Sequence, residues 1–201
     1  MRSLCTMDRI LPEDSCRNIR ATLQSLAIRR WNDLRAALTT LPDARTWLAC
    51  ALAYALFLFV AATIGVASGL LRVDVSHATA GDALRIAALL FIQPALLEEI
   101  VFRGLLLPRD VRSMRRSHAA VVGSLALAAY VASHPLNAWL FRPQVLSLFS
   151  SHTYLVLTTL LGFTCTTTYW ISRSLWPSVF IHWVTVVVWI GLLGGRALLH
   201  L

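Results

Sequence analysis

Five long apolar stretches alternate with short polar segments along the chain. They lie near residues 47–71, 84–107, 119–141, 152–171 and 176–195. About 20 helical residues cross the hydrocarbon core of a bilayer, so each stretch is long enough to form a transmembrane helix. The pattern therefore predicts an all-α fold, a polytopic transmembrane helix bundle of about five spans.

The region before the first apolar stretch follows a different pattern. Apolar residues recur at helical spacing with arginines over the remaining positions; they are Ile19, Leu23, Leu26, Leu34 and Leu38. This pattern predicts an amphipathic helix on the cytoplasmic membrane surface. A solvated helix that packs on nothing is the alternative. We therefore divide the chain into a basic cytoplasmic N-terminal segment, 1–46, and a membrane-embedded domain, 47–201.

Composition and charge agree with a membrane protein and predict its orientation. The chain is 57% hydrophobic, and all 18 of its basic residues are arginines. Eight arginines precede residue 47 and four lie in 108–118, whereas the loop between the first two stretches has only Arg72. The positive-inside rule then puts the N-terminus and the 108–118 loop in the cytoplasm, and we expect an integral protein of a bacterial inner membrane. The net charge of +8 is thus a topology signal, with attraction to anionic lipid, and predicts no nucleic-acid partner.

Three charged residues interrupt the second apolar stretch, in the sequence LLEEIVFRGLL. Each charge in mid-membrane costs roughly 2.5–3.5 kcal/mol on insertion scales. Glu99 and Arg103 are four residues apart, so they can form an ion pair on one helix face. Glu98 lies about 100° around the helix from Glu99 and needs another partner or a chemical task.

Two histidines, His134 and His182, also lie within apolar stretches. A lone membrane histidine is more often a hydrogen-bonded packing residue than a catalyst. Three unexplained polar groups on three helices instead indicate a shared site. We expect Glu98, His134 and His182 to converge in one cavity that faces the cytoplasm.

The motifs around these residues resemble those of the CPBP intramembrane proteases, which include type II CAAX prenyl endopeptidases and bacterial Abi or bacteriocin-processing proteins. Glu98 to Arg103 matches the EExxxR motif of that family. Tyr130 to His134 is similar to its FxxxH motif, with Tyr in place of Phe. His182 to Val186 is similar to its HxxxN motif, with Val in place of Asn.

The resemblance implies a glutamic-type endopeptidase that hydrolyses a peptide bond of a membrane-associated or lipidated protein or peptide. Glu98 would activate water, and His134 and His182 would position it and stabilise the oxyanion. Glu99 and Arg103 would support the site. With Val186 in place of the family's Asn, Thr185 or Asn137 are the candidate substitutes, and an inactive relative is an alternative.

Other chemistries fit the residues less well. A zinc protease typically shows HExxH, and no histidine neighbours Glu98 or Glu99, so we expect no cofactor; His134, His182 and Glu98 would still satisfy a three-ligand zinc site. A bis-histidine haem subunit would use His134 and His182 but leave Glu98 unexplained. A polar relay in a transporter is a further alternative. The four cysteines are scattered and predict neither a disulfide framework nor a zinc knuckle.

Overall fold

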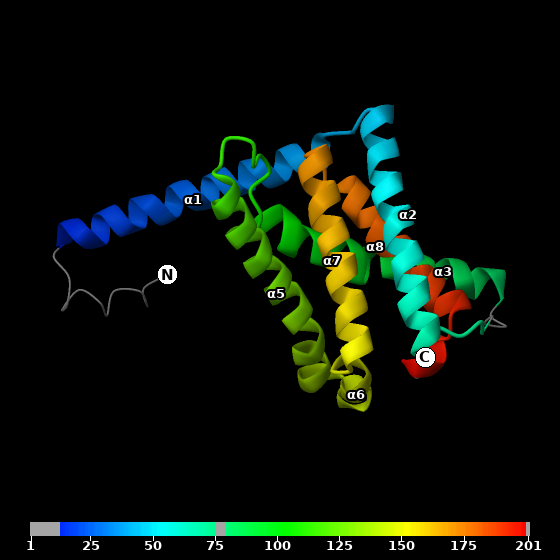
Figure 1. Cartoon of the computed structure of the whole chain (residues 1–201). Helices are drawn as coiled ribbons and strands as arrows, with labels where there is room; N and C mark the ends of the chain where they lie inside the picture. Colours follow the sequence, from blue (N-terminus) through cyan, green and yellow to red (C-terminus); the bar gives the residue numbers. More distant parts are fainter. Residues whose placement is uncertain (1–12, 75–78, 200–201) are drawn as a thin grey trace.

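The computed structural model describes residues 13–74 and 79–199, which are almost entirely helical (Figure 1). In chain order the elements are α1 (Glu13–Thr39), α2 (Ala44–Ala67), α3 (Ala80–Leu90), η2 (Phe91–Leu96), α4 (Leu97–Glu99), η3 (Ile100–Leu105), α5 (Arg116–Phe141), η4 (Pro143–Val145), α6 (Leu146–Phe149), α7 (His152–Ser172), α8 (Trp176–Leu192) and α9 (Gly195–Leu198). An isolated parallel bridge joins Asp74 to Leu193. The predicted all-α bundle is confirmed.

Four helices form the bundle, with α7 packed between α2, α5 and α8. Within the described residues, α2, α5 and α7 are long and apolar enough to cross a membrane. Helix α8 is apolar but shorter, with 17 residues. These four helices correspond to the first, third, fourth and fifth predicted spans.

Helix α2 begins at an N-cap that the sequence places just before the first apolar stretch. The Asp43 carboxylate accepts a hydrogen bond from the backbone N–H of Thr46 at 2.8 Å. Such a cap satisfies one of the free N–H groups of the first turn. Hydrogen bonds from the side chain and the backbone of Thr46 hold the pKa of Asp43 below its usual value. The cap therefore favours the charged carboxylate.

The second predicted span, 84–107, is not one straight helix. Gln93 has φ −135° and ψ 120°, which is extended backbone inside the stretch. Its successor Pro94 has no N–H to donate and disfavours helical geometry at the residue before it. The kink at Gln93 lies within η2, and the chain continues as α4 and the π-helical turn η3. Our expectation of an unbroken span overlooked Pro94, and both glutamates follow the kink.

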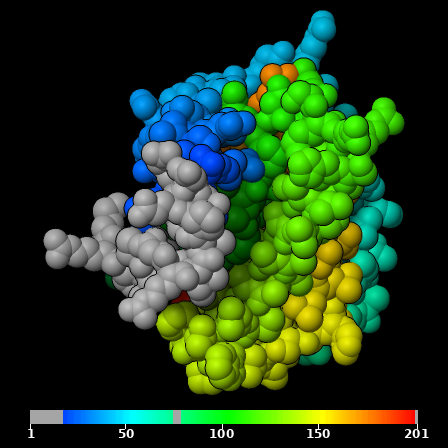
Figure 2. Space-filling model, turned by 90° about the vertical axis from the view of Figure 1, so that its left-hand side faces the viewer, coloured from blue at the N-terminus to red at the C-terminus, as the bar shows by residue number. Residues whose placement is uncertain are grey.

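Helix α1 lies across one end of the bundle (Figures 1 and 2). Its C-terminal part is docked, because Leu34 and Ala37 are buried against η3 and the ends of α7 and α8. Gly104 permits this approach, since a Cβ there would lie 2.5 Å from Leu34 Cδ1. Ile19 and Leu23, in the other half of α1, are exposed. The helix is as predicted; its place on a membrane surface stays a prediction, and residues 1–12 of the N-terminal segment lie outside the described residues.

The two ends of the bundle are named here by the helix termini that meet there. The near end holds the starts of α2, α5 and α8, the end of α7 and helix α1; the far end holds the opposite termini with α6 and α9. Hydrogen bonds fasten α1 to the near end: Arg109 donates to the Arg173 carbonyl and Thr40 Oγ1, and Trp176 donates to the Leu38 carbonyl. The near end also carries the arginine-rich segments, because α1 and the 108–118 loop lie there.

Candidate active site

Glu98, His134 and His182 come together from α4, α5 and α8. Nε2 of each histidine lies 4.0 Å from Glu98 Oε2. That oxygen is buried and has no hydrogen-bond partner among the described residues. A separation of 4.0 Å is too long for a direct hydrogen bond and suits contact through a small bridging molecule. The three predicted residues therefore share one site.

Both histidines present the same ring nitrogen to Glu98 because the other nitrogen is anchored. His182 Nδ1 is 2.9 Å from Glu99 Oε1, and His134 Nδ1 is 2.9 Å from the Tyr130 carbonyl. Carboxylate and carbonyl oxygens accept hydrogen bonds, so Nδ1 carries the proton in each ring. In a neutral ring Nε2 is then an acceptor, and it faces Glu98.

Glu99 and Arg103 form the ion pair that their spacing predicts. Arg103 Nη1 donates to Glu99 Oε1 at 2.9 Å, and Arg103 Nη2 donates to the Gly162 carbonyl at 2.8 Å. Both side chains are almost completely buried. One oxygen of Glu99 thus accepts hydrogen bonds from Arg103 and His182. Because α4 and η3 are joined in this way to α7 and α8, the ion pair holds four elements together.

Tyr130 packs against most of the charged and aromatic groups of the site. Its ring lies under the Arg103 guanidinium at 4.4 Å and meets the His134 and His182 rings edge-on at centroid distances of 4.9 and 6.1 Å. Gly162 on α7 leaves room for it, since a Cβ there would lie 2.7 Å from Tyr130 Cδ1. The Tyr at the first position of the FxxxH-like motif is therefore a packing residue at the centre of the site.

The site opens into a cavity of about 790 Å³. Its wall is mostly aliphatic and aromatic, and Glu98, Tyr130, His134 and His182 all line it. Glu98 is the accessible glutamate, with 24% of its side chain exposed against 0% for Glu99. The cavity therefore reaches the carboxylate that has no arginine partner among the described residues.

The cavity lies in the far half of the bundle, away from α1, and the side of the membrane to which it opens stays a prediction. Its lining begins at Tyr54 on α2, at Tyr130 on α5 and at His182 on α8, and on α7 it ends at Leu161. The stretches of these helices nearer to α1 contribute nothing to it. The sequence pattern identifies the charged residues near the cavity, but no pattern in it indicates which half of the bundle contains the cavity.

The comparisons with known proteins identify the family of the chain. A family model described as type II CAAX prenyl endopeptidase Rce1-like matches residues 80–188, which is more than half of the chain. The chain belongs to the Rce1-like family. The predicted resemblance is therefore confirmed, and all five predicted site residues lie within the matched region. No curated protein and no solved structure matched the chain.

Membership of the Rce1-like family supports a membrane endopeptidase in general and gives no support to a haem subunit. The three long apolar helices agree with an integral membrane protein. Residues 13–74 and 79–199 contain no cluster of three or more His, Cys, Asp and Glu side chains arranged for a metal ion.

Sequence reasoning for this Rce1-like chain missed several polar residues of the cavity wall. Gln93, Tyr154 and Trp189 line it together with Asn137, which we had considered only as a substitute donor. Gln93 reaches the wall through the Pro94 kink, a signal that was present in the sequence. Tyr154 lies close to the His134 ring, with centroids 5.9 Å apart, but it belongs to no motif.

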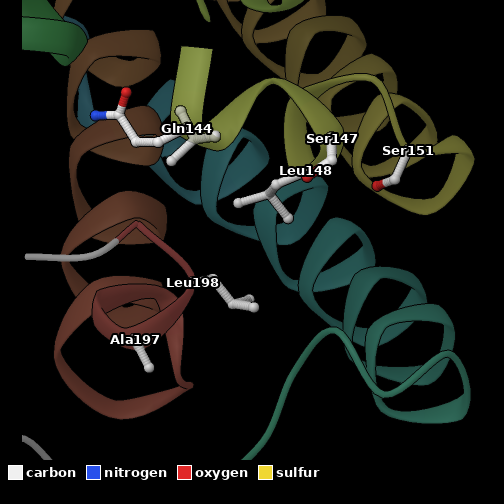
Figure 3. A pocket seen from close by; sticks show the side chains of 7 residues that line it. Gln144, Ser147, Leu148, Ser151, Ala197 and Leu198 are labelled. Atoms are coloured by element: carbon white, nitrogen blue, oxygen red, sulfur yellow. The ribbon is translucent and has the colours of Figure 1, made fainter. Parts of the chain in front are cut away.

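A second hollow lies at the far end between α6 and α9 (Figure 3). Gln144, Ser147, Leu148, Ser151 and Leu198 line it with Val145 and Ala197, and its volume is about 380 Å³. None of these side chains titrates or is charged. This hollow therefore has no group for acid–base chemistry, unlike the cavity at Glu98.

Proposed function

We propose that this Rce1-like chain is a glutamic-type intramembrane endopeptidase in which Glu98 is the general base. The observation that carries the proposal is the environment of Glu98 Oε2: a buried acceptor without a partner, faced by two histidine nitrogens at 4.0 Å. Such an oxygen suits a water molecule held for reaction. General bases must lie within hydrogen-bond reach, directly or through one water, of the proton they remove.

The reaction needs one water and one peptide bond. Glu98 takes a proton from the water, whose oxygen adds to the carbonyl carbon and leaves a negative charge on the carbonyl oxygen. The protonated Glu98 then returns the proton to the amide nitrogen as the carbon–nitrogen bond breaks. The products are a carboxyl group and an amine, and Glu98 is again a carboxylate.

The two histidines have different neighbours and therefore different tasks. His182 is bonded to the Glu99 carboxylate, whereas His134 is bonded to a neutral carbonyl. We propose that His182, on the side of the buried ion pair, stabilises the oxyanion, and that His134 positions the attacking water.

A side-chain amide supplies a further donor in place of the family's Asn. Val186 lies in the cavity wall and has no donor, and the Thr185 hydroxyl is already bonded to the Ile181 carbonyl and Tyr54. Asn137 follows His134 by three residues, on the same face of α5, and it lines the cavity. Its amide makes no hydrogen bond to any residue that the structure describes. We therefore assign the missing donor to Asn137.

The substrate proposed is a membrane-associated or lipidated protein or peptide. Most of the cavity wall is apolar, with Phe57, Leu58, Leu161 and Val188 among its residues. Transfer of apolar groups into such a wall contributes about 25 cal/mol per Å² of buried surface. An apolar segment or lipid chain therefore binds in the cavity while Glu98 meets the peptide bond.

The test compares Glu98→Gln with the wild-type protein in proteoliposomes, with a farnesylated CAAX peptide and an unlipidated transmembrane peptide as probes. Gln keeps the size of the side chain but cannot take a proton, so cleavage should fall by about 10²–10⁴-fold with unchanged thermal stability. Full activity of Glu98→Gln would disprove the glutamate mechanism. Loss of wild-type activity on chelation, restored by zinc, would replace it with a metal mechanism.

A further inference from the structure

Two hydrogen-bond donors on the cavity wall have no part in the proposed reaction. Nε1 of Trp189 is buried and has no hydrogen-bond partner among the described residues. Arg142 is half-buried; it donates to the Leu199 carbonyl at 2.9 Å and forms no ion pair with any acidic residue that the structure describes. A buried donor without an acceptor costs free energy in the folded protein. Both side chains are therefore available to a bound molecule that supplies an acceptor.

The two donors follow the two histidines along the helix faces that line the cavity. The lining residues at these spacings are His134, Asn137, Ala138, Phe141 and Arg142 at the end of α5, and His182, Thr185, Val186 and Trp189 on α8. Intervals of three, four, seven and eight residues keep side chains on one face of a helix. Arg142 and Trp189 therefore lie about 10–12 Å farther along their helices than His134 and His182.

Both donors lie beside the same short segment at the far end of the bundle. Trp189 packs against the apolar cluster that contains Ala138 and Leu199, and Arg142 donates to the Leu199 carbonyl. Gly195 in α9 leaves room for the indole, since a Cβ there would lie 2.8 Å from Trp189 Cδ2. The cavity therefore has Glu98 and the two histidines toward its inner end and the two donors toward the far end.

The chemistry of these donors selects one class of ligand group. An indole N–H only donates, and a guanidinium adds a positive charge and a planar set of donors, so the matching group is an anionic acceptor such as a carboxylate. Among the described residues that line the cavity, Glu98 alone is acidic, and it lies at the other end. An extended peptide advances about 3.3 Å per residue, so the separation of about 10–12 Å corresponds to about three residues of substrate.

We infer that Arg142 and Trp189 bind the free C-terminal carboxylate of the substrate, about three residues after the bond that is cleaved. The inference rests on the proposed function for the position of that bond, whereas binding of the carboxylate requires no catalysis. Arg142 and Trp189 are thus specificity-determining residues that take no part in proton transfer. A chain that ends at this distance puts its carboxylate at both donors, and an amide or a longer chain does not.

Cleavage in proteoliposomes tests the site with two probes, a farnesylated CAAX peptide with a free C-terminal carboxylate and the same peptide with a C-terminal amide. The wild-type protein should cleave the acid with a kcat/KM about 10–10²-fold above that of the amide, the range for hydrogen bonds to a charged group. Arg142→Gln should bring this ratio close to one, mainly through KM, and Trp189→Phe, which keeps the ring but removes the N–H, should lower it. Arg72→Gln is the matched control, because Arg72 is exposed at the far end and lies outside the cavity wall. It should keep the wild-type ratio.

Equilibrium binding of the same two peptides to the Glu98→Gln protein separates this inference from the proposed function. The acid should bind at least about 10-fold more tightly than the amide, and Arg142→Gln in the same protein should remove the difference, whichever group proves to be the base. Trp189→Phe tests the site by itself if Arg142→Gln fails to fold. Equal binding of acid and amide, no binding of either peptide, or a preference that survives both substitutions would overturn the inference.

Discussion

The near and far halves of the bundle are built from the same four helices, but the near half is tightly packed and the far half surrounds a cavity. In the near half, Leu107, Tyr169 and Leu175 are completely buried, and α1 closes the end. In the far half, the same helices surround about 790 Å³ of cavity. The boundary passes between two adjacent residues, because Glu99 is completely buried whereas Glu98 is partly exposed. The EExxxR motif therefore spans the boundary between the packed half and the half with the cavity.

The largest effect is expected for Arg103, which forms the buried ion pair beside the boundary between the two halves. Arg103→Gln leaves Glu99 buried without its cation and the Gly162 carbonyl without its donor, so the free energy of unfolding should fall by about 3–5 kcal/mol. Thermal unfolding in detergent measures the loss. Arg112→Gln, in the exposed loop, is the control and should change stability by less than about 0.5 kcal/mol. Equal melting temperatures for the two variants would mean that the ion pair does not hold the near half.

A smaller effect is expected in the far half, on activity alone. Asn137→Ala removes the proposed oxyanion donor, so kcat should fall by about 10²-fold with little change in thermal stability. Val186→Asn in the same protein should restore part of the activity, because it returns an amide to the cavity wall. Gln144→Ala, outside this cavity, is the matched control. Unchanged kcat in Asn137→Ala would assign the donor elsewhere.

The docking of α1 can be tested with two leucines of the same helix. Leu34 is 5% exposed and packs on Gly104, whereas Leu23 is 61% exposed. Leu34→Ala should lower the free energy of unfolding by about 2 kcal/mol, because it removes buried methyl groups at the near end. Leu23→Ala should have almost no effect in detergent. If both substitutions cost the same, α1 is not docked through its C-terminal half.

The smallest effect concerns the Asp43 cap at the near end. The pKa of Asp43 is lowered in the folded protein, so its contribution to stability is present above the unfolded pKa and is lost as the pH falls through the folded value. The melting temperature of the wild-type protein should therefore drop more than that of Asp43→Asn between neutral pH and pH values below 3.8. Identical pH dependence of the melting temperature in both proteins would show that the Asp43 cap does not contribute to stability.

The fold and most of the site could be predicted because their signals are local. Apolar length predicts the membrane helices, and a spacing of four residues predicts the Glu99–Arg103 pair. The bond between His182 and Glu99 joins residues 83 apart in sequence and depends on how α8 packs on α4. No local pattern reports that packing. The kink at Gln93 has a local sequence signal, Pro94. The cavity of the far half depends on how the helices pack and has no such signal.

Gly162 has no side chain, and this absence affects the spacing between Glu98 and the two histidines on other helices. A methyl group at Gly162 would meet the Tyr130 ring at 2.7 Å, and that ring contacts Arg103, His134 and His182. Any displacement of the ring would therefore shift the histidine rings that pack on it and change their distances to Glu98. The size of the space around Glu98 thus depends on the absence of a side chain at residue 162, although α7 contributes no reacting group.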